Sequence, residues 1–316
     1  MALHRLVGDT EDLRRAWETT PLHSRDLGDF EDVFGLALAE DLIVNRGLRI
    51  PYLRLLHDGG YVPASRFTHR TGTGAGQADG VADPHAVLRE MERGATVVLR
   101  GLVRYCPEVA AFCEQLSAEL GFPASAGAYL TPAGSRGAGP HYDPMSVLVR
   151  QVHGVKHWRL QAPPVPWPRT LPSPGEHYDT PVIAELDLRP GDSLYIPRGV
   201  VHDAWTTDSE SVHITFSGDT PPMWADVLHD LVDEAAALDP TLRETFPWRF
   251  ATAPSAVAAQ AEERLATLRA FLDTVDTDAL ATRVVDRHSA RTRPAPRGRL
   301  AATLAGRPGP GAEPPR

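Results

Sequence analysis

The stretch GPHYDPMSVLVRQVHGVKHW, residues 139–158, decides how this chain is interpreted. His141 and Asp143 are separated by one residue, and in an extended strand such a pair points to the same face. A valine-rich run follows, and the chain then turns at His153-Gly154 into Lys156. An imidazole and a carboxylate on one face are half of a metal site, so a third ligand has to come from elsewhere.

The composition indicates a globular protein rather than a nucleic-acid binder. The 316 residues are 42% hydrophobic and 23% charged, which is enough apolar material for a substantial core. A formal net charge of −9 argues against general nucleic-acid binding. We expect no signal peptide and no membrane-spanning segment. The two cysteines, Cys106 and Cys113, fit neither a disulfide framework nor a zinc pattern, so we expect a cytoplasmic protein with reduced thiols.

The composition and the spacing of apolar residues change along the chain. Between residues 124 and 218, short runs rich in Val, Ile, Tyr, Trp and Thr alternate with Pro and Gly, which predicts an antiparallel barrel or double-sheet jelly roll with flanking helices. We assign residues 1–220 to a catalytic domain around this core. Residues 221–290 have helical apolar spacing and are either a dimerisation module or a lid on their own barrel. The Pro- and Arg-rich residues 291–316 are predicted to be disordered.

The best third ligand is His202, in the segment PGDSLYIPRGVVHDAWT. A Pro-Gly-Asp turn and a buried strand lead to it, in the same predicted barrel as His141 and Asp143. An isolated His-x-Asp pair often arises by chance, and the second histidine is what favours a metal site. Two histidines and one carboxylate are the ligand set of non-heme Fe(II) oxygenases, which leaves coordination positions open.

The position of Lys156 depends on how the barrel curls. QVHGVK is typical of a hairpin with a two-residue His-Gly turn, which would place Gln151 opposite Lys156. In a straight strand Gln151 would lie roughly 26 Å from Asp143. Pro144 cannot donate to a ladder, so we expect the strand to break there and the chain to turn a corner. The alternative is a lysine exposed on the hairpin.

A second hairpin is expected in VVHDAWTTDSESVHITFSG. A turn at Asp208-Ser209 would pair His202 with Thr215 and Ala204 with His213. One face of this hairpin is then polar and the other apolar. The polar face is either solvated or lines an active site while the apolar face packs on helices.

Several of these segments resemble one protein family. GATVVLRGL, AYLTPAGSRGAGPHYD, VRQVHGVKHWRL and RPGDSLYIPRGVVHDAWT…SVHITF are similar, in order and spacing, to the JmjC or cupin-like 2-oxoglutarate-dependent oxygenases, and among them to the bacterial ribosomal-oxygenase type. The resemblance covers roughly residues 30–220. It implies a double-stranded β-helix core that holds Fe(II) with His141, Asp143 and His202.

The resemblance also implies a set of residues around 2-oxoglutarate. Lys156 would bind the distal carboxylate, and Tyr129 would hydrogen-bond it, while His213 and Thr215 would lie around the cofactor. An ammonium group with rotatable donors suits a carboxylate in a partly dry pocket. Two departures stand out. Gly127 replaces an asparagine that often precedes the tyrosine by two residues, and too few residues follow the helices for the winged-helix region of larger ribosomal oxygenases.

The function implied is a hydroxylase that uses dioxygen on a protein side chain, with a possible homodimer through the C-terminal helices. Alternatives are a hydroxylase of a small peptide or an amino-acid-derived metabolite, and a non-catalytic metal-binding cupin. A cupin isomerase would need more histidines and a glutamate after His141, which the strand lacks. Demethylation of an N-methyl group uses the same hydroxylating step and is not separated by any motif. We expect His153, His157 and His177 not to be ligands.

Overall fold

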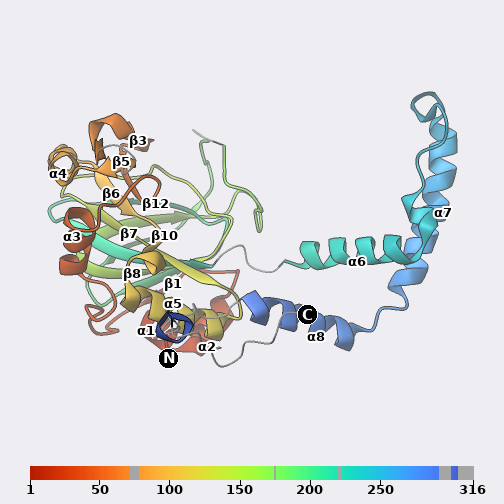
Figure 1. Cartoon of the computed structure of the whole chain (residues 1–316), viewed down its shortest axis with the longest axis horizontal. Helices are drawn as coiled ribbons and strands as arrows, with labels where there is room; N and C mark the ends of the chain where they lie inside the picture. Colours follow the sequence, from red (N-terminus) through yellow and green to blue (C-terminus); the bar gives the residue numbers. More distant parts are fainter. Residues whose placement is uncertain (72–77, 174–175, 219–222, 292–299, 305–316) are drawn as a thin grey trace.

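The computed structural model describes residues 1–71, 78–173, 176–218, 223–291 and 300–304. Figure 1 shows a body of strands flanked by helices, with further helices extending to one side. The strands are β1 Leu22–Ser24, β2 Leu53–His57, β3 Gly60–Tyr61, β4 Thr68–Thr71, β5 Ala78–Ala82, β6 Thr96–Leu99, β7 Ala124–Thr131, β8 Val147–Gly154, β9 Lys156–Gln161, β10 Val182–Leu188, β11 Ser193–Ile196, β12 Val201–Trp205 and β13 Ser211–Gly218.

The strands form two facing layers. The larger sheet has the order β1-β11-β8-β13-β7-β6-β2-β3, the smaller one has the order β10-β9-β12, and β4 pairs with β5 separately. Every pairing is antiparallel. Successive strands cross between the layers: β8 lies in the larger sheet, and β9, only one residue later, lies in the smaller sheet. This arrangement is a jelly roll, so the predicted fold class is confirmed.

Both expected hairpins are wrong. β9 pairs with β10 and β12 and not with β8, and β13 pairs with β7 and β8 and not with β12. In a jelly roll, consecutive strands face each other across the core, and the alternation of side chains is the same in either arrangement. The predicted faces therefore hold although the pairing does not. Ile214 and Phe216 are buried in the core, while His213 and Thr215 point the other way, toward a cavity.

The helices are α1 His4–Val7, α2 Thr10–Ala16, α3 Leu36–Val44, α4 Pro84–Glu92, α5 Pro107–Leu120, α6 Trp224–Leu238, α7 Pro254–Leu272, α8 Thr277–Arg291 and α9 Leu300–Leu304, with 3-10 turns η1 Ala64–Arg66, η3 Leu102–Arg104, η4 Pro240–Arg243 and η5 Phe250–Thr252. The boundaries have local causes. Asp83 accepts hydrogen bonds from the first amides of α4 and Pro84 opens it, while Gly121 ends α5 at φ 78°.

The main core lies between the larger sheet and the helices that cover its outer face. Phe216 of β13 contacts Phe112 of α5, with ring centroids 5.0 Å apart, and Phe30 packs edge-on against both rings. A second, smaller core lies between the two sheets and includes Trp158 and Leu160 of β9. Val147, Val149 and Trp158 of this smaller core also line a cavity between the sheets.

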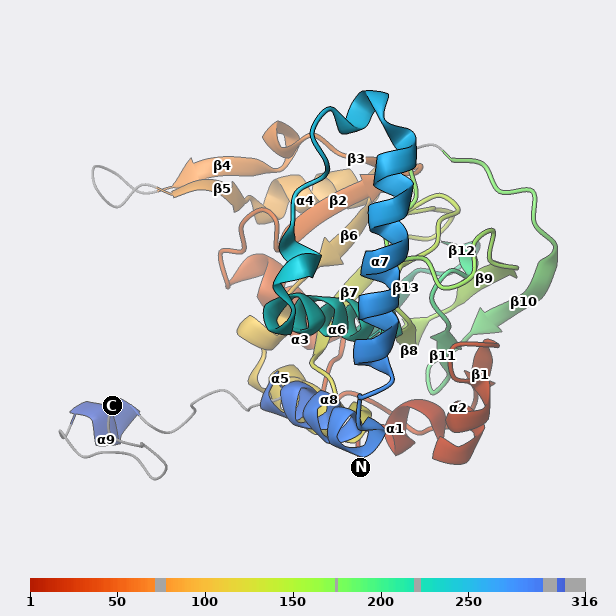
Figure 2. The same cartoon turned by 90° about the vertical axis from the view of Figure 1, so that its right-hand side faces the viewer.

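Residues 223–291, which we call the helical arm, extend away from the strands in Figure 1, and α7 crosses in front of them in Figure 2. Ion pairs Arg283–Glu234 at 3.0 Å and Arg287–Asp230 join α8 to α6. Most of the predicted disordered tail lies outside the described residues, and α9 is the described part beyond Arg291. Among the described residues, no helix combines the length and apolarity needed to cross a membrane.

Candidate active site

His141, Asp143 and His202 converge on one point. Their ligand atoms all lie within 4.8 Å of one another, and they are the only such group of three or more among the residues described. A two-residue bridge makes this possible: the amide of each histidine donates to the carbonyl of the other, at 3.1 and 2.8 Å. Asp143 precedes a bend at Pro144, so the strand breaks where the sequence indicated and the carboxylate reaches His202 Nε2 at 3.7 Å.

The two imidazoles are oriented as metal ligands require. His141 Nδ1 donates to the carbonyl of Gly139 at 2.9 Å, and His202 Nδ1 donates to the carbonyl of Val200 at 3.1 Å. A carbonyl can only accept, so Nδ1 of each ring carries a proton, and Nε2 is the nitrogen left to bind a metal. Burial, with a further effect of His141, lowers the pKa of His202 well below its ordinary value, which keeps this ring neutral and able to bind a metal.

The triad opens into a cavity of about 540 Å³ between the two sheets. All seven residues proposed from the sequence line this one cavity: His141, Asp143, His202, Lys156, Tyr129, His213 and Thr215. They come from both sheets and from the segment before β8. Because jelly-roll strands curl around a common axis, residues far apart in sequence meet here, as a flat sheet would not allow.

Lys156 is buried at the inner end of the cavity. The residue is 3% exposed, and its Nζ donates to Thr131 Oγ1 at 2.8 Å. Burial lowers its pKa to about 7, and no carboxylate lies within ion-pair distance among the described residues. A buried ammonium without an anionic partner is costly, and a carboxylate ligand would remove that cost. The alternative of a solvent-exposed hairpin lysine is excluded.

Tyr129 and His213 line the cavity together with Lys156 and the triad. They are direct cross-strand partners on β7 and β13, with rings stacked at 4.9 Å between centroids. Burial raises the pKa of Tyr129 to about 12, so its hydroxyl remains a donor. His213 Nδ1 and Trp158 Nε1 are buried without a hydrogen-bond partner. Unpaired buried polar atoms in a cavity wall point to a ligand or ordered water that pairs with them.

The residues that line the cavity fit the Fe(II) ion and the 2-oxoglutarate that the resemblance implied. Two imidazoles and a carboxylate on one side of a site are the donor set of non-heme Fe(II), and they leave room for other ligands. Lys156, without an anionic partner at the inner end, fits the far carboxylate of a small dicarboxylic acid. The cavity thus has a place for both Fe(II) and 2-oxoglutarate.

Sequence reasoning missed several residues of the cavity. Arg100 and Tyr61 line it from the first hundred residues, and Trp158 lines it from β9. His177 also lines it, from the loop before β10, but does not join the ligand cluster. A signal was available for Arg100 alone, as a charged residue directly after the buried strand TVVL.

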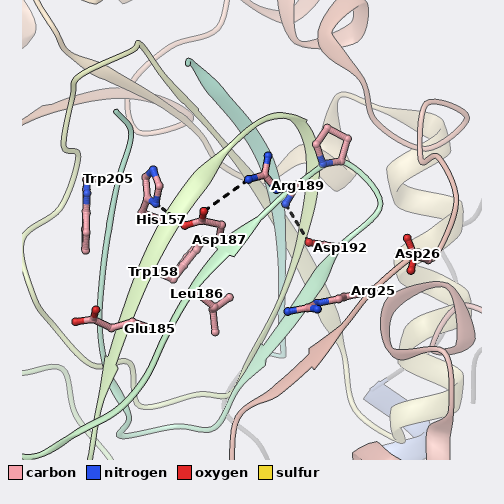
Figure 3. Close-up of a pocket in the computed structure, with 11 residues that line it drawn as sticks. Arg25, Asp26, His157, Trp158, Glu185, Leu186, Asp187, Arg189, Asp192 and Trp205 are labelled. Atoms are coloured by element: carbon pink, nitrogen blue, oxygen red, sulfur yellow. Dashed lines mark hydrogen bonds and ion pairs between the residues drawn. The ribbon is translucent and has the colours of Figure 1, made fainter. Parts of the chain in front are cut away.

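A second hollow, of about 740 Å³, lies outside the barrel and contains none of the triad. Figure 3 shows His157, Asp187 and Arg189 there, on strands β9 and β10 and the turn after β10. His157 pairs with Asp187 and contacts Thr207 Oγ1 at 2.9 Å, and His153 pairs with Glu210 at 2.8 Å. The larger hollow is therefore not the metal site, and neither histidine belongs to the triad cluster.

Comparison with known proteins gives the same assignment. The JmjC domain family matches residues 100–226. Ribosomal oxygenase 2 of Bos taurus is 36% identical over 162 residues, covering 49% of this chain and 35% of that protein. The bifunctional lysine-specific demethylase and histidyl-hydroxylase NO66 of Drosophila persimilis is 30% identical over 226 residues, covering 70% of this chain and 31% of that one. The chain spans about a third of the length of both relatives.

Solved structures agree on the fold. The structure of YcfD, a ribosomal oxygenase from Escherichia coli, superimposes with a TM-score of 0.52 at 16% identity, covering 85% of this chain and 67% of that one. At this identity the likeness concerns the fold alone. The jelly roll, the converging triad and the family match lead to one conclusion: residues 100–226 of this chain are a JmjC domain.

Proposed function

We propose that this chain is an Fe(II)- and 2-oxoglutarate-dependent dioxygenase that hydroxylates a side chain of a protein substrate. The observation that carries the proposal is the placement of His141, Asp143 and His202 in one cavity with the buried Lys156. The same cavity contains both a facial set of metal ligands and a cation that can bind a carboxylate. A fold alone would not imply this activity.

The chain's own residues have distinct tasks in this function. His141, Asp143 and His202 hold the metal, and the Nδ1 bonds of the two histidines fix their rings. Lys156 and Tyr129 bind the distal carboxylate of 2-oxoglutarate and set its distance from the metal. When bound, iron and 2-oxoglutarate activate dioxygen, so that one oxygen atom ends in succinate, with release of carbon dioxide, and the other ends in the hydroxylated product.

The test is succinate formation after anaerobic loading with Fe(II) and 2-oxoglutarate followed by exposure to oxygen. We expect the wild type to form succinate and His141→Ala to form none above background. His157→Ala is the matched control, because His157 lies on the outer face of the smaller sheet, paired with Asp187. Equal behaviour of wild type and His141→Ala would refute the enzyme and favour a non-catalytic metal-binding cupin.

A protein substrate is supported by the rim of the cavity and by the relatives. Tyr61 and Leu171, which line the cavity, are 54% and 65% exposed, so the opening offers apolar contacts at the surface. A net charge of −9 favours basic protein segments. Relatives carry the names ribosomal oxygenase and histidyl-hydroxylase. Mass spectrometry of ribosomal proteins incubated with the enzyme should detect the mass of one added oxygen. Modification only of free amino acids or short peptides would favour the small-molecule alternative.

We also propose that the helical arm pairs with a second copy of the chain. Trp224, Leu228 and Val232 recur every four residues on α6 and are 77%, 53% and 45% exposed, which is one apolar helix face left uncovered. A stripe of this kind suits a two-fold helix pairing, in which the same face is used by both partners. Light scattering should give the mass of a dimer for wild type and of a monomer for Leu228→Glu. A monomeric wild type would contradict the pairing.

A further inference from the structure

Two short segments connect the metal ligands to the barrel. Residues 144–146 lead from Asp143 into β8, and residues 197–199 lead from β11 toward His202 on β12. The amide of Gly199 donates to the carbonyl of Asp143 at 2.9 Å, so the second segment is bonded directly to the ligand residue that precedes the first. The distance between the Asp143 carboxylate and the His202 imidazole therefore depends on how the two segments are held together.

One carboxylate bridges the two segments. Glu18, which follows α2, accepts a hydrogen bond from Ser146 Oγ at 3.0 Å on one carboxylate oxygen and one from Arg198 Nε at 2.5 Å on the other. The side chains of Glu18 and Arg198 are only 20% and 12% exposed, so solvent screens this pair less than it screens the ion pairs of the helical arm. Glu18 lies in the chain before residues 100–226, which match the JmjC family.

The hydrogen bonds around Glu18 require a carboxylate. Ser146 Oγ accepts from the amide of Arg198 and from the hydroxyl of Tyr195, both at 3.2 Å, so its two lone pairs are occupied and its proton needs an acceptor. Arg198 Nε can only donate. Both partners of the Glu18 side chain are therefore donors. A carboxylate presents an acceptor oxygen to each of them, whereas an amide would present an NH₂ group to one.

Glu18 is itself held by its backbone. Its amide donates to the hydroxyl of Tyr195 at 3.0 Å, and its carbonyl accepts from Trp167 Nε1 at 3.2 Å. The ring of Trp17 stacks on that of Tyr195, with centroids 5.7 Å apart. The φ of Glu18 is 57°, in the left-handed region that a residue with a Cβ rarely adopts. A residue that several contacts keep in an unfavourable conformation points to a role for its placement.

We propose that Glu18 is a positioning residue of the metal site. By binding Ser146 and Arg198 together, its carboxylate fixes the two segments relative to each other. The Asp143 carboxylate and the His202 imidazole, which adjoin these segments, are thereby kept at a distance that suits one ion. This inference rests on the proposed function, because it requires that the triad binds a metal ion.

Titration with Co(II) tests this role without turnover, because calorimetry gives the affinity and the visible absorption spectrum of Co(II) reports the geometry of its ligands. Glu18→Gln keeps the size of the side chain but replaces an acceptor by a donor. We expect it to weaken Co(II) binding by about 10- to 100-fold and to shift the spectrum, as for other outer partners of metal ligands. Glu11→Gln is the matched control, because Glu11 pairs with Arg14 on the exposed surface of α2. It should bind Co(II) like the wild type, with an unchanged spectrum.

Urea denaturation of the metal-free variants separates positioning from folding. If Glu18→Gln is less stable but, while folded, binds Co(II) with the affinity and spectrum of the wild type, Glu18 supports only the fold, and the inference is wrong while the proposed function stands. A wild type that binds Co(II) no better than His141→Ala would refute both. If Glu18→Gln does not fold, Ser146→Ala serves instead, because it removes one of the two contacts of the carboxylate. The same direction of change in Co(II) affinity and spectrum is expected, and wild-type values would overturn the inference.

Discussion

The barrel and the helical arm bury their apolar side chains in different ways. In the barrel, Phe216 is 1% exposed and Val201 is fully buried, with rings and strands packed from both sides. In the arm, Trp248 and Trp224 are 90% and 77% exposed, and the helices are joined by surface ion pairs. The barrel is therefore stabilised by its own core and can hold reactive groups in fixed positions. The arm, by contrast, leaves large apolar side chains exposed.

Substitutions should therefore cost more in the barrel than in the helical arm. Side chains of the barrel are packed by neighbours on several sides, so removal of one side chain leaves a polar partner unpaired or creates a cavity. Groups of the arm are in water on one side, and exposed ion pairs contribute little.

The largest effect is expected at the metal site. His202→Ala removes a ligand that is itself held by a backbone bridge to His141. Loss of an outer partner of a metal ligand typically costs about 10- to 100-fold, so loss of the ligand itself should lower succinate formation by more than roughly 100-fold. Succinate assays with saturating iron measure this. A rate within tenfold of wild type would show that His202 does not hold the metal.

Among the substitutions that affect stability, one in the core of the barrel should lower the free energy of unfolding most. Phe216→Ala removes a ring that packs between Phe30 and Phe112. Such truncations cost about 3–5 kcal/mol in the free energy of unfolding. Urea denaturation followed by circular dichroism gives the value. A loss under about 1 kcal/mol would mean that this part of the barrel repacks freely and is not a rigid scaffold.

A pH dependence should follow from Lys156. Burial lowers its pKa from 10.5 to about 7, so the free side chain is charged below pH 7 and neutral above it. Because the carboxylate of 2-oxoglutarate needs the charged form, affinity should be full below pH 7 and weaken by up to about tenfold per unit as pH rises above 7. The pKa of His213 is lowered well below its ordinary value by burial and by Lys156, so this ring stays neutral in that range.

Titrations of the Mn(II)-loaded protein from pH 6 to 9 measure this dependence. Lys156→Arg is the matched control, because a guanidinium remains charged throughout, and its affinity should not follow the same profile. An affinity of the wild type that is flat across this window would rule out Lys156 as the group that binds the carboxylate.

The smallest effect is expected in the arm. Trp248→Ala removes an aromatic side chain larger than that of Phe216, but one that is 90% exposed. Surface substitutions of this kind usually change the free energy of unfolding by no more than about 0.5 kcal/mol. Denaturation under the conditions used for Phe216→Ala gives the comparison. A cost as large as that of the core substitution would show that the arm is packed against a partner at this residue.

The sequence predicted the face of a strand on which a side chain lies, but it did not predict which strands pair with each other. Alternation placed His202, His213 and Thr215 on one side and Ile214 and Phe216 on the other, and the structure agrees. The same alternation fits a hairpin and a crossover between sheets equally well, so the pairing of β12 with β13 was wrong. Short turns favoured a hairpin locally, and only the closure of the whole barrel decides otherwise.

Residues of the cavity were predicted when their spacing in the sequence had a physical meaning, and they were missed when they had no such spacing. His141 and Asp143 have a spacing with a physical meaning, and the break at Pro144 explains how they reach the cavity. Arg100 has no such pattern, because its position depends on β6 pairing with β7 and on the missing side chain of Gly127. Contacts made by strand pairing between distant segments are not visible in local periodicity.

The most direct test is a crystal structure of the protein soaked with Fe(II) and 2-oxoglutarate under anaerobic conditions, with anomalous scattering used to locate the iron. We expect a single strong peak bonded to His141 Nε2, His202 Nε2 and a carboxylate oxygen of Asp143, with Lys156 Nζ on the distal carboxylate. Iron bound elsewhere, or Lys156 directed into bulk water, would refute the proposed metal and co-substrate site.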